Sequence, residues 1–108
     1  MPEKKSLGEF EHLVLLAVLQ LKEDARAIDI RFHIQDQAGR SVSRGALYSS
    51  LERLEKKGFL SWEVEDSSPE RGGIPRRRFF VTEAGLEAVR SSHQAISVLS
   101  RGLEEVLG

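Results

Sequence analysis

The spacing of the apolar residues changes twice along this 108-residue chain, and the two changes restrict the folds that it can adopt. Up to residue 57, apolar side chains recur at intervals of three and four residues, which predicts helices buried along one face. Over residues 59–65 and 77–82 they alternate with polar side chains, which predicts the two strands of a hairpin. The helical spacing then returns. The sequence therefore predicts a mostly α fold in the order helix, helix, helix, strand, strand, helix.

Capping residues indicate where these helices begin and end. Ser6 and Glu9 have the Ser-x-x-Glu spacing of a capping box at the start of the first helix. Asp24, Ser43 and Thr82 precede the next three apolar segments and are candidate N-caps. The expected elements are helices over residues 7–22, 25–38, 44–57 and 83–107, with Gly39 and Gly58 ending the second and third, and strands over 59–65 and 77–82.

Composition and length favour one small domain spanning residues 1–108. Hydrophobic residues make up 40% of the chain and charged residues 31%, a balance typical of globular proteins. The longest uncharged apolar run, residues 13–19, is far shorter than the ~20 residues that cross a bilayer. The first ten residues lack the apolar region of a signal peptide, and the chain has no cysteine for disulfides or thiolate-bound zinc. We therefore expect a cytoplasmic protein without a membrane partner.

Basic residues are concentrated in the middle of the chain, although the net charge is only −1. Residues 40–78 carry nine basic and six acidic side chains, a local charge of +3, whereas the rest of the chain carries −4. A polyanion responds to the local field of the surface that it approaches. This middle segment is therefore a candidate for contact with nucleic acid.

The predicted order of elements matches the layout of a winged helix-turn-helix. In that fold the third helix enters the major groove of DNA, and the hairpin forms a wing beside it. Opposite its predicted core stripe, the third helix carries the small residues Gly45, Ser49 and Ser50, which let its backbone approach DNA closely. The wing combines glycines with arginines, which suit phosphates and narrow minor grooves. The candidate DNA contacts are Ser43, Arg44, Gly45, Tyr48, Ser49 and Arg53 in and before the third helix, and Arg71, Arg76, Arg77 and Arg78 in the wing.

Some of these side chains have structural alternatives. Arg78 could pair with a glutamate of the first strand, and Arg53 could pair with Asp36 or a nearby glutamate. Tyr48 could instead anchor the third helix, half-buried against the core. We expect Trp62 to pack on the sheet rather than to hold a ligand.

The last predicted helix is too long for a domain of this size to cover. Its apolar residues recur at nearly heptad spacing, and about 24 residues of helix extend well beyond a small core. A second copy of the chain could cover the distal stripe. We therefore expect residues 7–82 to form the DNA-binding part and residues 83–107 to form a dimerisation helix. The candidate interface residues are Leu16 from the first helix, and Leu86, Val89, Ile96, Leu99, Leu103 and Val106 from the last.

Several stretches of the sequence resemble one known family. The third helix reads VSRGALY at residues 42–48 and LERLEKKG at 51–58. The wing and the start of the last helix read ERGG at 70–73, PRR at 75–77 and FFVTEAG at 79–85. Together with residues 13–21 of the first helix, these stretches resemble the PadR family of transcriptional regulators over nearly the whole chain.

That resemblance implies a winged-helix homodimer that binds promoter DNA, usually as a repressor, with the C-terminal helix supplying most of the dimer contact. Some members release DNA when a phenolic or drug-like ligand binds, which implies a small hydrophobic effector. The chain departs from many members at Arg26 and Ala27, where they carry an aromatic residue and a glycine.

Two other classes of function stay open. A winged helix can be a protein-interaction module that does not bind DNA directly, or a dimer whose main role is ligand binding. No enzyme is expected, because the sequence has no phosphate-binding loop and no hydrolase or metalloprotease motif. The histidines His12, His33 and His93 lack metal-binding spacing, so no metal site or cofactor is expected.

Overall fold

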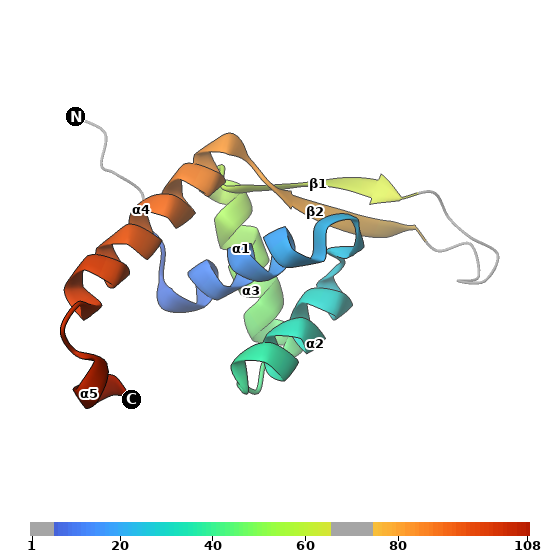
Figure 1. Ribbon diagram of the computed structural model, residues 1–108. Helices are drawn as coiled ribbons and strands as arrows, with labels where there is room; N and C mark the ends of the chain where they lie inside the picture. The colour runs from blue at the N-terminus through green and yellow to red at the C-terminus, as the bar shows by residue number, and fades with distance from the viewer. Residues whose placement is uncertain (1–5, 66–74) are drawn as a thin grey trace.

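The elements follow the predicted order, with two additions, a short turn after the first helix and a short helix at the C-terminus. The computed structural model describes residues 6–65 and 75–108, so Arg71 lies outside the described residues. The three-residue turn η1 (Lys22–Asp24) follows the first helix, and the hairpin contains two antiparallel strands. The helices are α1 (Glu9–Leu21), α2 (Ala27–Ala38), α3 (Arg44–Lys56), α4 (Glu83–Ser100) and α5 (Glu104–Leu107), and the strands are β1 (Leu60–Glu65) and β2 (Arg76–Val81) (Figure 1). The predicted fold class is therefore confirmed.

The first helix begins later than the sequence predicted. Gly8, not Ser6, is the N-cap of α1, and its backbone N–H donates to Glu11 Oε1 at 2.7 Å. The predicted pairing of Ser6 with Glu9 is therefore wrong. Lys57, the C-cap of α3, also holds the Glu11 carboxylate, and this tertiary contact fixes the side chain that reaches back to the N-cap of α1.

The N-cap of α2 was also predicted wrongly, whereas the caps of α3 and α4 are confirmed. Asp24 belongs to the 3₁₀ turn η1, and Arg26 is the N-cap of α2. The Ser43 hydroxyl accepts a hydrogen bond from the Ala46 N–H at 3.1 Å. The Thr82 hydroxyl accepts one from the N–H of the third residue of α4 at 3.0 Å.

The core lies where α1, α2, α3 and the root of the hairpin meet, with α1 in the centre of the view in Figure 1. The apolar side chains that recur at helical spacing in α2 and α3 are buried, as that spacing predicts: Ile30, Ile34, Leu47, Leu51 and Leu54. Burying one such side chain stabilises the fold by about 1.5–3 kcal/mol. The other core residues are Val14, Leu15, Ala17, Val18, Ala25, Val42, Phe59, Leu60, Phe79 and Val89.

The hairpin has one side on the core at its root and exposed side chains toward its tip. Leu60 faces Val81 and Trp62 faces Phe79, and directly opposite residues share one side of the sheet. Phe79 also donates its backbone N–H to the Ala25 carbonyl at 2.8 Å. The root of the wing is therefore attached to the connection between α1 and α2.

The hairpin and α4 extend from the core in opposite directions (Figure 1). Buried His12 of α1 anchors the middle of α4, because its Nδ1 is hydrogen-bonded to Ser92 Oγ at 2.8 Å. Burial, together with nearby His93, lowers the pKa of His12. The radius of gyration is 15.6 Å, whereas a compact chain of this length has about 13 Å. The distal half of α4 is thus an arm rather than part of the core.

The C-terminal helix is broken, which the sequence did not predict. α4 ends at Ser100, and Gly102, with a φ of 80°, turns the chain into α5. Positive φ at this point suits glycine, because it has no Cβ to clash with the backbone. The single helix expected over residues 83–107 is therefore wrong after Ser100, and Leu103 becomes the N-cap of α5. No helix within the described residues is long and apolar enough to span a membrane.

Candidate nucleic-acid interface

The outer face of α3 carries most of the predicted recognition residues. Arg44, Gly45, Tyr48 and Ser49 are exposed, opposite the buried leucine stripe. A Cβ added to Gly45 would have no atom within 4 Å, so this part of the helix surface is open. Ser50 differs, since it is 1% exposed. The expectation that it lies on the approach surface is therefore wrong.

The first turn of α3 presents a cation and an aromatic ring together. The guanidinium carbon of Arg44 lies 5.5 Å from the centroid of the Tyr48 ring, a cation–π arrangement. The Ser43 hydroxyl caps the same turn. A helix N-terminus with exposed amides favours a negatively charged group, and Arg44 adds a full positive charge beside it.

The three described wing arginines have different surroundings. The guanidinium carbon of Arg77 lies 4.6 Å from the centroid of the Trp62 ring, and Trp62 also donates its indole N–H to Glu55 of α3. Arg78 is half-buried and pairs with Glu63, which raises the pKa of Arg78. Arg76 is exposed at the start of β2. Arg76 and Arg77 are therefore better placed than Arg78 to contact an external partner.

A shallow groove brings the wing and α3 together. Its walls come from the start of α2, from Tyr48 on α3 and from β2. It places Arg76 and Arg77 in the same concavity as the tyrosine. The lining residues are Arg26, Ala27, Ile28, Tyr48, Pro75, Arg76, Arg77 and Phe79.

Arg53 is directed partly toward its own chain. It donates to the buried Ser50 hydroxyl at 3.0 Å, and its Nε lies 3.7 Å from Glu11 Oε2. Glu11 is 5% exposed, and its carboxylate is held more closely by Lys57 Nζ, at 2.8 Å. Burial alone would raise the pKa of Glu11, but the bonds from Lys57 and the Gly8 N–H and the charge of Arg53 lower it. Arg53 therefore has a partner on α1, far away in the sequence, rather than Asp36 or one of the neighbouring glutamates.

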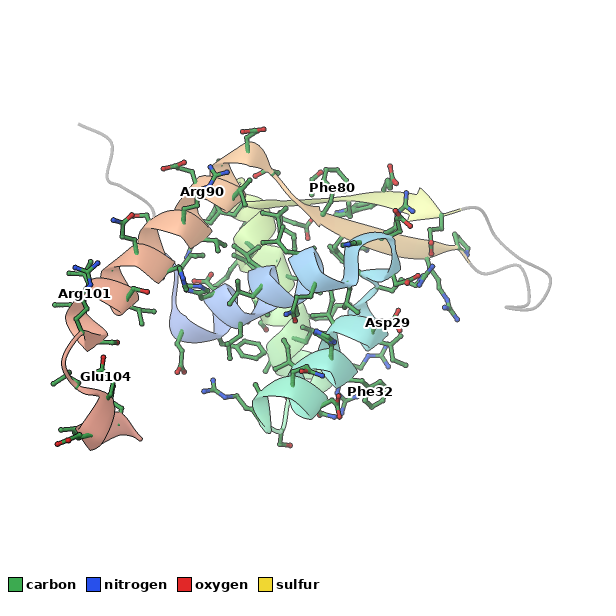
Figure 2. The ribbon with its side chains drawn as sticks, viewed as in Figure 1. Asp29, Phe32, Phe80, Arg90, Arg101 and Glu104 are labelled. Atoms are coloured by element: carbon green, nitrogen blue, oxygen red, sulfur yellow. The ribbon has the colours of Figure 1, made fainter. Side chains whose placement is uncertain are left out.

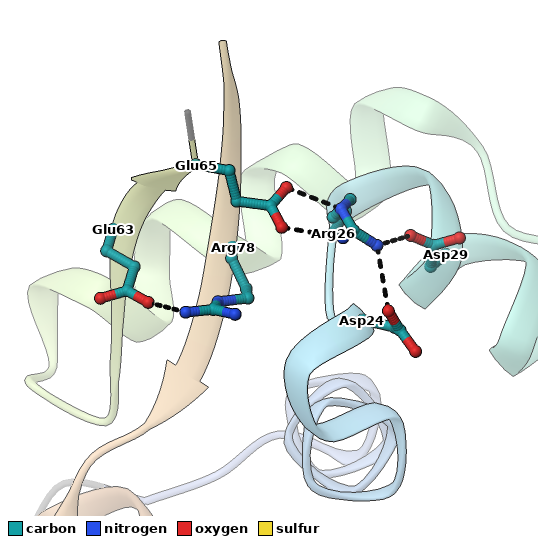
Figure 3. Close-up of polar contacts among 6 residues, drawn as sticks. All are labelled: Asp24, Arg26, Asp29, Glu63, Glu65 and Arg78. Carbon is teal, nitrogen blue, oxygen red and sulfur yellow. Dashed lines mark hydrogen bonds and ion pairs between the residues drawn. The ribbon is translucent and has the colours of Figure 1, made fainter. Parts of the chain in front are cut away.

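The sequence did not point to a further set of ion pairs beside the groove. Arg26 binds Glu65 at the end of β1 through two hydrogen bonds, and Asp24 and Asp29 lie near the same guanidinium (Figure 3). The Glu65 bond, against a smaller opposing effect of burial, raises the pKa of Arg26. The two residues are 39 positions apart, so local spacing gave no signal for the pair.

The predicted dimerisation residues separate into two groups. Val89 lies in the core of its own chain at 6% exposed, and Leu86 is half-buried. The distal residues are uncovered, with Leu99 78% and Val106 80% exposed. Figure 2 shows polar side chains, among them Arg90, Arg101 and Glu104, along the same arm. The other exposed apolar side chains on α1, α4 and the C-terminal segment are Leu16, Leu19, Ile96, Val98, Leu103 and Leu107.

The outer side of α1 also has an apolar groove. It lies between α1 and α2 and includes Leu13, Leu16 and Leu19, with His33 and Gln37 at its α2 edge.

Within residues 6–65 and 75–108, no group of three or more His, Cys, Asp or Glu side chains could hold a metal ion.

The model of the transcriptional regulator PadR-like family matches residues 15–91. The match includes α2, α3, the hairpin and the first half of α4, and so it covers every element that lines the groove. This chain belongs to that family. The members of this family are transcriptional regulators, not enzymes. A search of curated proteins found no match.

The fold is also similar to those of solved structures of PadR-family proteins. A PadR-like transcription factor from Bacteroides fragilis is 28% identical with a TM-score of 0.72, over 90% of this chain and 88% of that one. A PadR family regulator from Eggerthella lenta is 29% identical with a TM-score of 0.69, over 92% and 86%. PadR from Bacillus subtilis, solved with operator DNA, is 14% identical with a TM-score of 0.61, over 76% of this chain and 46% of that one.

Proposed function

We propose that this PadR-family regulator binds promoter DNA as a homodimer, with α3 in the major groove and the wing arginines on flanking phosphates. The two α3 helices of the dimer would enter successive major grooves, about 34 Å apart, on a pseudo-palindromic site. Arg44, Gly45, Tyr48 and Ser49 would face the groove edges. Arg76 and Arg77 would position the protein without reading sequence.

The observation that carries the proposal is the groove lined by Tyr48, Arg76 and Arg77. Recognition of DNA needs a helix face with small and polar residues beside cations that hold the backbone. Here the groove places Tyr48 of α3 beside the wing arginines Arg76 and Arg77, in a chain with a net charge of only −1. The neighbour from Bacillus subtilis, which has this fold, was solved with operator DNA.

Dimerisation is proposed through the uncovered apolar residues of the C-terminal arm. Ile96, Leu99, Leu103 and Val106 are more than two-fifths exposed, and Leu16 is 37% exposed on α1. So many exposed apolar side chains on one short segment favour an interface. We further propose that the regulator acts as a repressor in the cytoplasm, and that a small hydrophobic effector releases it by changing the separation of the two α3 helices.

A salt titration tests the proposal. The protein is titrated with its own upstream DNA and with a random duplex of equal length, from low to moderate ionic strength. DNA binding predicts a higher affinity for the upstream duplex, with log K falling linearly with log salt by about 0.9 for each neutralised phosphate. Equal, salt-independent or absent binding to both duplexes would contradict it, and a protein partner of the wing would then be sought by cross-linking.

A further inference from the structure

Arg26 connects the start of α2 to the far end of the hairpin. Its Nε and Nη2 lie 2.7 Å from Oε2 and 2.8 Å from Oε1 of Glu65, a bidentate arrangement (Figure 3). Asp24 and Asp29 are 3.4 and 3.5 Å from Nη1, so they are weaker partners. Both side chains of the Arg26–Glu65 pair are only about one-fifth exposed, at 22% and 18%. This burial and geometry distinguish the pair from ordinary surface ion pairs, which contribute little.

This pair is the second of two attachments of the wing to the connection between α1 and α2. The first is the backbone bond from Phe79 to the Ala25 carbonyl, at 2.8 Å. Phe79 lies in the core half of β2, whereas Glu65 is the last residue of β1. The core packing and the Phe79 bond hold the root of the hairpin, and the Arg26–Glu65 pair adds a restraint on its angle at the far end of β1.

The pair also lies beside the wing cations. Glu65 lies directly opposite Arg76 in the sheet register, and opposite charges at such positions attract each other. Arg26 instead donates a hydrogen bond to each oxygen of the Glu65 carboxylate. Within the described residues, Arg76 makes no ion pair, and it lines the groove beside Tyr48.

We propose that Arg26 is a positioning residue for DNA binding, which acts through Glu65 to hold the wing at the angle where Arg76 and Arg77 face the same groove as α3. The inference rests on the proposed function, because the wing angle affects binding only where the partner spans both α3 and the wing. Arginine suits this role better than lysine, since its planar fork matches both carboxylate oxygens.

The decisive variant is Glu65→Ala, because two explanations predict opposite changes in its affinity for DNA. Removing an acidic group next to the wing strengthens binding to a polyanion if only charge matters. If Glu65 holds the wing through Arg26, the same variant weakens binding, on the order of ten-fold, and lowers the salt slope by about one. Glu63→Ala is the matched control, since Glu63 lies on the same strand and the same side but pairs with Arg78, not with α2.

Two variants of Arg26 and the single tryptophan complete the test. Arg26→Ala should weaken DNA binding as Glu65→Ala does, and the double variant should be no weaker than either single one, because the two residues act as a unit. Arg26→Lys should recover part of the affinity. Trp62, the only tryptophan, lies in the hairpin, so its emission and acrylamide quenching report the wing angle without DNA. Each variant is compared below its own unfolding transition.

The outcomes separate the two proposals. Weaker binding by Glu65→Ala, with Glu63→Ala as tight as the original protein or tighter, supports the inference. Equal or tighter binding by Glu65→Ala overturns it and leaves the DNA-binding proposal intact. Failure of the original protein to bind DNA in a salt-dependent way overturns the proposed function and the inference with it.

Discussion

At the scale of the residue, the first turn of α4 packs closely against the root of the hairpin at Gly85. A Cβ on Gly85 would lie 2.1 Å from the Phe59 carbonyl oxygen and 2.8 Å from Val81 Cγ1. The carbonyl oxygen is backbone and cannot move aside. Gly85→Ala should therefore destabilise the fold by about 3 kcal/mol, which lowers the Tm by roughly 4–8 °C for each kcal/mol.

Gly45→Ala is the matched control for that measurement. Gly45 also lies in a helix, but nothing is within 4 Å of its added Cβ. Alanine is the better helix former, so this variant should gain about 0.5 kcal/mol. Urea unfolding of both variants decides the point, and a similar loss of stability in the two would contradict the steric argument.

Glu11 should make the stability of the fold depend on pH in the acidic range. Its pKa is lowered in the folded chain, so its contribution is present above the ordinary value of 4.5 and is lost as the pH falls through the lower folded value. Glu11→Gln leaves Lys57 with a weaker partner and should cost about 1–3 kcal/mol at pH 7.

The difference between the original protein and Glu11→Gln should shrink below pH 4.5, which urea unfolding at several pH values measures. Glu87→Gln, on an exposed residue of α4, should change stability by less than about 0.5 kcal/mol at every pH. A difference that stays constant down to pH 2 would show that charge at Glu11 is not responsible.

The contribution of the wing to DNA affinity can be measured separately from sequence recognition. Arg76→Ala and Arg77→Ala should each weaken binding to specific and random DNA alike and lower the salt slope by about one. Arg77→Ala also removes the cation–π contact with Trp62, so it should change the tryptophan emission, whereas Arg76→Ala should not. Arg90→Ala, which removes the same charge from α4, is the control. An unchanged salt slope in both wing variants would contradict their contact with phosphates.

The elements differ in how far the sequence could predict them. The core stripes, the hairpin and the caps at Ser43 and Thr82 depend on residues that are close in the sequence, so local patterns predicted them. The start of α1 depends on Glu11 and Lys57, which are 46 positions apart. Only the folded chain brings such residues together, and the ion pair of Arg26 was missed for the same reason.

The C-terminal arm shows a different limit of local patterns. Apolar residues at near-heptad spacing continue through Leu103 and Val106, and this spacing predicted one helix to residue 107. The propensity of Gly102 for positive φ outweighed the pattern, and the helix ends at Ser100. The spacing still marks the residues that the described chain leaves uncovered, among them Leu99 and Val106.

At the scale of the whole molecule, the proposed dimer predicts that the apolar residues of α4 and the DNA-binding surface depend on each other. Leu99 is 78% exposed on the distal half of α4. Leu99→Asp places a charge in the proposed interface, where burial without a partner is costly. It should therefore convert a dimer to a folded monomer, which sedimentation equilibrium measures. Ser97→Asp, which adds the same charge two residues earlier on another side of α4, should stay dimeric.

The same variant tests whether DNA binding requires the dimer. A monomer keeps α3 and the wing, so it should retain weak binding to any duplex with a reduced salt slope, because half of the phosphate contacts are lost. It should lose preference for a pseudo-palindrome, since that preference comes from two α3 helices at a fixed spacing of about 34 Å. A monomeric Leu99→Asp that still prefers the full site would place recognition in one chain and contradict the two-fold arrangement.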